Sequence, residues 1–158
     1  MTLNAGQNNM MSEHHAKISW ERGDAPFDYQ SYPRDHTWSF TGGIEVSASA
    51  APDYLGSDAR VDPEEGFVAA ASSCHMLTFL AIAARKKFIV ERYIDDAIGF
   101  LEKDGDGKLA ITRITLRPRI VFAPDAGPTR EQLDRLHHSA HEHCFIARSV
   151  KTAIDVEF

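Results

Sequence analysis

The chain contains few cysteines, since only Cys74 and Cys144 occur among its 158 residues. Two cysteines cannot build the disulfide framework of a small secreted domain. The N-terminal segment, residues 1–17, has no apolar run and does not read as a signal peptide. We therefore expect a cytoplasmic protein, in which a disulfide is transient and takes part in a reaction.

Clustered positive charge is also missing. The 17 Lys and Arg residues stand against 23 Asp and Glu, which gives a formal net charge of −6, and no basic run occurs. Nucleic-acid binding depends on clustered Lys and Arg, so we expect no nucleic-acid partner. Internal repeats and low-complexity segments are absent as well. The length fits a single domain over residues 17–158, with residues 1–16 as a flexible N-terminal tail.

Charge is absent from the longest apolar stretch. No Asp, Glu, Lys or Arg occurs from Gly66 to Ala84, and Cys74 lies in the middle. Asp62 suits a helix N-cap, Pro63 the first helical position and Glu65 the capping-box position. The stretch is near the ~20 residues that a membrane span needs, but its alanines and polar residues make its hydrophobicity modest. We expect a buried central helix over residues 62–85 and no membrane partner.

Alternation of apolar and polar residues predicts strands on both sides of this helix. The segments with this pattern are residues 17–20, 36–40, 44–48, 88–101, 109–122 and 152–158. Gly42 and Gly43 make a hairpin turn between the second and third of them. A second hairpin turn lies at residues 104–107, which lack the spacing of a calcium loop. Pro118 is expected at a sheet edge or bulge.

A second helix is predicted between Thr129 and Cys144. Thr129 suits its N-cap, and Gln132 has the capping-box position. Apolar residues recur along it three and four positions apart and so share one face, namely Leu133, Leu136, Ala140 and Cys144. We expect Cys144 to point inward with them. The order of strands, long helix, strands, helix and strand predicts an α+β fold.

The two cysteines are either inert core residues or a reactive pair. Free cysteine is among the most buried residue types, which favours the first interpretation. A reactive thiol must be held as thiolate, and Cys74 in mid-helix needs a nearby cation for this. Arg34 precedes a predicted strand, and the fold can bring it to Cys74. Glu64 can orient such an arginine, but it lies ten residues before Cys74, about three helical turns, and cannot touch the thiol.

The histidines leave two other kinds of site open. His137 and His141 are four residues apart on the second helix, so they can share a metal ion with Cys144 close by. Neither an HExxH nor a CxxC motif supports this site. Cys–His nucleophilic catalysis needs a base that faces Cys74. His75 is adjacent to Cys74 on the helix and faces elsewhere, so the base would come from another element, such as His141.

Taken together, these motifs resemble those of the OsmC/Ohr family, the osmotically inducible and organic hydroperoxide resistance proteins. The resemblance lies in Asp62-Pro63-Glu64-Glu65, in Cys74 ten residues after Glu64, and in Ala140-His141-x-x-Cys144. Order and spacing agree over about residues 17–158. The resemblance implies an intertwined homodimer in which antiparallel sheets wrap two long central helices. It also implies a thiol peroxidase without metal, haem or other cofactor.

The resemblance further implies a role for each site residue. Cys74 takes the place of the peroxidatic cysteine, Cys144 that of the resolving cysteine, and Glu64 that of a carboxylate that pairs with a catalytic arginine. We choose Arg34 as this arginine, with Arg22 as the second choice. The implied substrate is an organic hydroperoxide, and the implied reductant is an external dithiol of the lipoyl type.

The sequence departs from the family pattern beside both cysteines. Phe145 follows Cys144, where the hydroperoxide-resistance branch commonly has proline, and His75 follows Cys74. These departures indicate a distinct subgroup. Two alternatives stand beside the peroxidase. One is a dimeric stress or binding protein that keeps the fold without peroxidase activity, and the other is a His/Cys metal-binding protein.

Overall fold

The chain has an α+β fold, as the sequence predicted. The computed structural model describes residues 11–158, which form two compact units that divide after Val61. Of the expected N-terminal tail, residues 1–10 lie outside the described residues, and residues 11–15 have no regular secondary structure. The single domain over residues 17–158 stays a prediction.

The first unit contains a three-stranded antiparallel sheet. Its strands pair in the order β1 (Ala16–Ser19), β2 (His36–Phe40) and β3 (Glu45–Ala48). Gly42 and Gly43 form the turn between β2 and β3 with φ values of 89° and 77°, which glycine adopts without strain. A 3-10 turn, η1 (Pro52–Tyr54), follows β3. The hairpin predicted around the two glycines is confirmed.

The second unit is organised around the helix α1 (Pro63–Arg85). The Asp62 carboxylate accepts a hydrogen bond from the Glu65 N–H at 2.7 Å, and the Glu65 carboxylate accepts one from the Asp62 N–H at 3.2 Å. This reciprocal pair is the predicted capping box, so the start of the helix is confirmed. In length and composition α1 is long and apolar enough to cross a membrane. The core helix of a soluble protein meets the same two criteria.

Four strands of this unit form one long, interrupted hairpin. Its pairs are β4 (Val90–Asp95) with β7 (Pro118–Phe122), and β5 (Ile98–Lys103) with β6 (Leu109–Leu116), all antiparallel. The register continues through the interruption, because Asp95 is opposite Pro118 and Ile98 is opposite Thr115. Pro118 has no N–H to donate and is the first residue of β7, where the strand restarts. A last strand, β8 (Ala153–Val156), adds parallel to β6.

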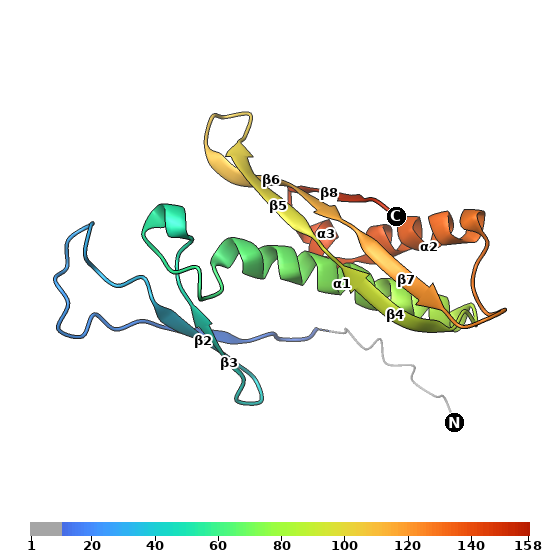
Figure 1. Ribbon diagram of the computed structural model, residues 1–158, viewed down its shortest axis with the longest axis horizontal. Coiled ribbons are helices and arrows are strands. Elements are labelled where there is room, and N and C mark those ends of the chain that lie inside the picture. Colours follow the sequence, from blue (N-terminus) through green and yellow to red (C-terminus); the bar gives the residue numbers. More distant parts are fainter. Residues whose placement is uncertain (1–10) are drawn as a thin grey trace, which may run out of the picture. The chain divides into compact units, whose positions relative to one another are not determined.

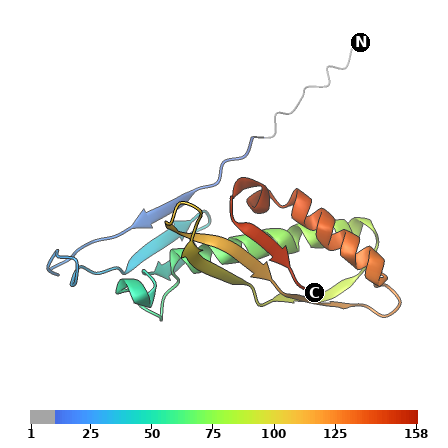
Figure 2. The same ribbon diagram turned by 90° about the horizontal axis from the view of Figure 1, so that it is seen from above.

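The helix α2 (Arg130–His143) packs beside α1 and is followed by the short α3 (Phe145–Ser149). Figures 1 and 2 show α1 and α2 side by side, and in Figure 1 the strands β4 to β7 run diagonally past them. Between the helices lies a buried cluster made of Phe79, Ala83, Leu136 and Ala140. The predicted Thr129–Gln132 capping box is present at the start of α2. The inward face of this helix therefore agrees with its sequence pattern.

Only one stripe of α1 is buried within the single chain. It consists of residues spaced four apart, namely Ala71, His75, Phe79 and Ala83, each at most 1% exposed. Leu77, on another side of the helix, is 60% exposed. The sequence predicted burial on nearly every side, and the single chain covers only part of this apolar surface. Monomeric soluble proteins rarely leave a continuous apolar helix face exposed.

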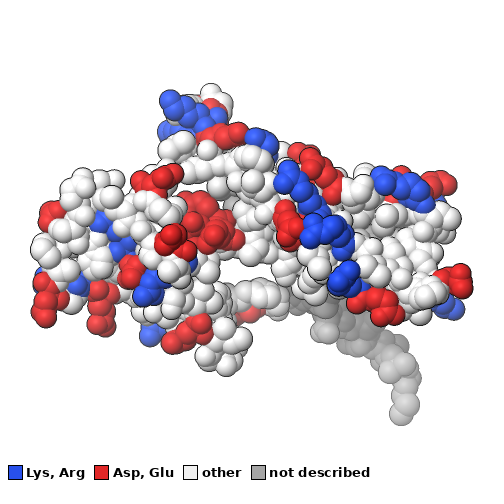
Figure 3. All heavy atoms as spheres, in the orientation of Figure 1, with Lys and Arg blue, Asp and Glu red and all other residues white. Residues whose placement is uncertain are grey.

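Charges of both signs are mixed on the surface. In the view of Figure 3, Lys and Arg atoms lie among Asp and Glu atoms, and the one diagonal band of positive charge to the right of the centre has acidic atoms beside it. This distribution agrees with the lack of a basic run in the sequence.

Candidate active site

Cys74 and Cys144 lie together where α1 meets the end of α2. Both are free thiols; Cys74 is half-buried in α1, and Cys144, the residue after α2, is 1% exposed. The two side chains are close enough to share a hydrogen bond. The inward position predicted for Cys144 is confirmed. The fold thus joins two cysteines that are 70 residues apart in the sequence.

The protonation of Cys144 separates the roles that the two thiols can take. Burial raises the pKa of the Cys144 thiol to about 11, and the hydrogen bond with Cys74 raises it too. The Ala147 N–H donates to Cys144 Sγ at 3.4 Å and only partly opposes this rise. Cys144 is therefore a protonated thiol at neutral pH, and the thiolate is the attacking form. Of the pair, Cys74 is the better candidate for the first nucleophile.

A buried histidine pair lies beside these cysteines. His75 Nε2 is 3.1 Å from His137 Nδ1, and the two side chains are 1% and 2% exposed. Burial lowers the pKa of each imidazole to about 4, so both are neutral at pH 7. His75 follows Cys74 directly, and His137 precedes Cys144 by two helical turns. No sequence pattern indicated this pairing, because the two residues are 62 positions apart.

Glu64 lies in the first turn of α1. It lines a cavity of about 660 Å³ together with acidic residues of both α1 and β4, and with apolar residues such as Val68 and Ile98. Glu64 and Cys74 are ten positions apart, which is about 15 Å along the axis of α1. The structure therefore does not bring Glu64 to the Cys74 of the same chain.

Arg34 and Arg22 both belong to the first unit. The Arg34 guanidinium donates to the backbone oxygens of Tyr32 and Tyr29 and lies 3.6 Å from the centroid of the Tyr32 ring. Arg22 donates to the backbone oxygen of Ala25 at 2.6 Å. The role of either arginine at Cys74 stays a prediction.

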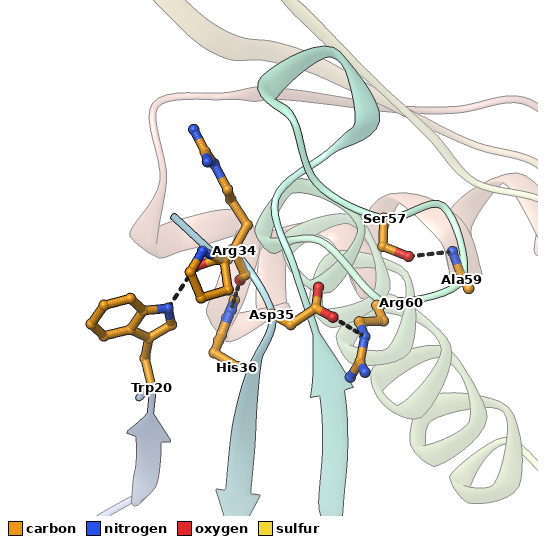
Figure 4. Close-up of polar contacts among 8 residues, drawn as sticks. Trp20, Arg34, Asp35, His36, Ser57, Ala59 and Arg60 are labelled. Atoms are coloured by element: carbon orange, nitrogen blue, oxygen red, sulfur yellow. Dashed lines mark hydrogen bonds and ion pairs between the residues drawn. The ribbon is translucent and has the colours of Figure 1, made fainter. Parts of the chain in front are cut away.

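Two further contacts fix the backbone around Arg34. The Trp20 indole N–H donates to the Pro33 oxygen at 2.6 Å, and His36 Nδ1 lies 2.8 Å from the Arg34 oxygen. Figure 4 shows the Arg34 side chain extending away from both of these contacts. The guanidinium is thus held by its own loop while its backbone is anchored to β2.

Metal binding gains no support from residues 11–158. Within this part of the chain, no group of three or more His, Cys, Asp or Glu side chains is arranged to hold a metal ion. His137, which the sequence placed in a possible site with His141 and Cys144, directs Nδ1 to His75 instead.

Comparisons with known proteins agree with this fold. A family model described as OsmC-like protein matches residues 56–158. The solved structure of an OsmC-like protein of unknown function from Vibrio cholerae O1 biovar eltor is 50% identical, with a TM-score of 0.89 over 93% of this chain and 99% of that chain. A comparison with curated proteins gives no match.

More distant solved structures share the fold. The organic hydroperoxide resistance protein OsmC from Legionella pneumophila is 17% identical, with a TM-score of 0.68 over 93% of this chain and 95% of that chain. An organic hydroperoxide resistance protein from Elizabethkingia anophelis is also 17% identical, with a TM-score of 0.70 over 94% of each chain. At this identity the likeness concerns the fold alone.

Proposed function

Because the chain belongs to the OsmC-like protein family, we propose that it is a cysteine-based peroxidase that reduces organic hydroperoxides. Family membership confirms the family resemblance found in the sequence, and it supports a redox or stress protein in general. The observation that carries the finer proposal is the contact between Cys74 and Cys144, with Cys144 held as a buried, protonated thiol.

The proposed reaction has three steps. The Cys74 thiolate attacks the distal oxygen of the hydroperoxide, the O–O bond breaks, and an alcohol leaves after taking up a proton. Cys74 is then a sulfenic acid. The Cys144 sulfur attacks it while its proton passes to the departing hydroxyl group, which forms the disulfide and releases water. An external dithiol, of the lipoyl type, reduces this disulfide by exchange and is itself oxidised. These steps require no metal or other cofactor, and they suit the reducing cytoplasm.

We further propose that the active protein is a homodimer. One argument is the apolar face of α1 around Leu77, which the single chain leaves exposed. The other is the distance of about 15 Å along α1 between Glu64 and Cys74. If two copies of α1 pack in opposite directions, Glu64 of the partner subunit can approach Cys74. There it can orient Arg34, or Arg22, beside the thiolate.

A thiol count after peroxide treatment tests this function. The purified, reduced protein is mixed with cumene hydroperoxide or with hydrogen peroxide, and free thiols and remaining peroxide are followed together. We expect the wild type to lose two thiols for each hydroperoxide consumed, and to react faster with the organic peroxide because Met76, Leu77 and Phe79 make the region around Cys74 apolar. A Cys74→Ser variant should consume no peroxide. The proposal fails if wild type keeps both thiols or if Cys74→Ser matches its rate.

The alternative is a dimeric stress or binding protein without peroxidase activity. The cavity of about 660 Å³ beside Glu64 is the feature that favours it, because its volume suits a small molecule. This alternative predicts that both cysteines survive peroxide treatment unchanged. The same thiol count therefore separates the two functions.

A further inference from the structure

The His75–His137 pair is unusual because polar rings occupy the core between α1 and α2. The imidazole planes are parallel within 5°, and one hydrogen bond joins them at 3.1 Å. The outer nitrogens, His75 Nδ1 and His137 Nε2, are buried and have no hydrogen-bond partner within residues 11–158. Unpaired buried polar atoms destabilise a fold relative to apolar side chains of similar shape. The pair therefore needs an explanation other than stability.

Its neighbours hold the His137 ring in one place. Phe158 stacks against this ring with a centroid distance of 4.0 Å, and Phe79 of α1 contacts it at 4.6 Å. An imidazole that is fixed on two sides and hydrogen-bonded on a third cannot slide along α1 without breaking these contacts. The pair thus defines where α2 lies on α1.

The two cysteines belong to the same two elements, with Cys74 in α1 and Cys144 directly after α2. Cys74 immediately precedes His75, and Cys144 lies seven residues, or two helical turns, after His137. The histidine contact and the cysteine contact therefore start from adjacent residues on different faces of α1 and are about 10 Å apart along α2. Two such contacts prevent α2 both from sliding along α1 and from rotating about a contact, whereas a single contact leaves α2 free to rotate about it. A disulfide tolerates only a narrow range of Cα and Cβ separations, so this fixation matters for the thiols.

We propose that His75 and His137 are positioning residues that hold Cys144 against Cys74 and so set how readily the two thiols form a disulfide. This proposal rests on the proposed function, in which that disulfide is an intermediate. The buried hydrogen bond lowers stability, but it can form in only one alignment of α2 along α1 and so specifies that alignment. An apolar pair at these positions would pack without requiring one register.

Equilibration with glutathione tests the proposal without any peroxide. The protein dithiol gives two electrons and two protons to oxidised glutathione, which becomes two molecules of reduced glutathione, and the Cys74–Cys144 disulfide forms. Thiol trapping followed by mass spectrometry gives the ratio of disulfide to dithiol, and hence the effective concentration of the two thiols. We compare wild type with His75→Leu and His137→Phe, which remove the hydrogen bond, and with His75→Gln, whose amide can restore it. Circular dichroism identifies which variants remain folded.

We expect the effective concentration to fall about tenfold in His75→Leu and in His137→Phe, as the loss of one buried hydrogen bond implies. His75→Gln should stay within about threefold of wild type. The matched control is Ala83→Gly, a buried position two turns further along α1 that weakens the helix without touching the pair. It should also stay within about threefold of wild type.

The outcomes separate this proposal from the proposed function. If His75→Leu, or His137→Phe where His75→Leu does not fold, keeps the effective concentration of the Ala83→Gly control, the positioning role is wrong and the peroxidase proposal is untouched. If the wild type forms no internal disulfide at any glutathione ratio, both proposals are wrong.

Discussion

The Ser72 hydroxyl of α1 donates a hydrogen bond to the Asp95 carboxylate at the end of β4. The other oxygen of this carboxylate accepts the backbone N–H of Arg117 at 2.6 Å, where β6 gives way to β7. One carboxylate therefore ties the central helix to both strands of the long hairpin at the point where that hairpin is interrupted. The sequence around Asp95, which is followed by Asp96, did not indicate this role.

Replacing Asp95 by alanine should lower the free energy of unfolding by about 1–3 kcal/mol, because Ser72 and the Arg117 N–H both lose their partner. Urea titration of the folded protein measures this loss. Asp96→Ala is the matched control, since Asp96 forms an exposed ion pair with Arg119 at 2.6 Å and should cost less than about 1 kcal/mol. Equal losses in the two variants would show that Asp95 does not tie these elements together.

Stability should fall in mild acid because of His75 and His137. Their pKa values are about 4 in the folded protein, against 6.5 for an ordinary histidine, so the unfolded chain binds more protons between these values. Their contribution is therefore complete above pH 6.5 and is lost as the pH falls towards 4. Burial is the largest cause of both lowered pKa values. His141 further lowers the pKa of His75 and Asp95 raises it, while His75 and Arg130 further lower the pKa of His137 and Asp134 raises it.

Thermal unfolding from pH 7 to pH 4.5 at constant ionic strength measures this dependence. The melting temperature of His75→Gln should decline less steeply than that of the wild type, since one buried imidazole is gone. Comparing the two slopes removes the contribution of carboxylates, which titrate in both proteins. Parallel slopes would contradict the assignment.

Alanine at Gly99 should strain the contact between β5 and α1. A Cβ atom there would lie 2.5 Å from Val68 Cγ2, too close for packed carbon atoms. We expect Gly99→Ala to lose about 1–3 kcal/mol in urea titration. Adding Val68→Ala should recover part of this loss, while Gly105→Ala, which meets no atom within 4 Å, should be close to neutral. A double variant as unstable as the sum of its single changes would argue against the clash.

Removing the second cysteine should trap the first intermediate. In Cys144→Ser, Cys74 can react with one equivalent of organic hydroperoxide but cannot form the internal disulfide. Dimedone, which reacts with sulfenic acids, should then label Cys74 in this variant and label wild type far less. Labelling is read by intact mass. If dimedone labels neither protein after peroxide is consumed, the sulfenic acid step is wrong.

Mixed dimers should show whether Glu64 acts across the subunit boundary. Cys74→Ser and Glu64→Gln are each expected to lose peroxidase activity in isolation. Unfolding and refolding the two together forms heterodimers, in which one site has Cys74 from one subunit and Glu64 from the other. Activity should reappear in this mixture alone. If the mixture stays as inactive as its components, Glu64 acts within its own chain or not at all.

Local signals made the helix boundaries predictable. Each helix begins with a capping box, in which two residues three positions apart satisfy free N–H groups of the first turn. These pairs, Asp62 with Glu65 and Thr129 with Gln132, can be recognised directly in the sequence. The inward position of Cys144 followed from the helical repeat for the same reason. The arithmetic of one helix also showed that Glu64 could not reach Cys74.

Contacts between distant segments were beyond such signals. The pairing of His75 with His137 spans 62 positions, and the hydrogen bond from Ser72 to Asp95 spans 23. Each depends on how α1 packs against another element, which neither periodicity nor capping encodes. The sequence predicted strand structure over residues 88–101, and the structure divides this segment into the two strands β4 and β5.

The parallel pairing of β8 with β6 has a consequence for synthesis of the chain. Arg113 is paired with Ala153, so the two partners are 40 residues apart. At about 5–20 residues per second, a ribosome needs roughly 2–8 seconds to make the intervening segment. Throughout that interval the edge of β6 is open to pairing with other nascent chains. Slow translation or crowded polysomes should therefore favour aggregation through β6, before either cysteine has met its partner.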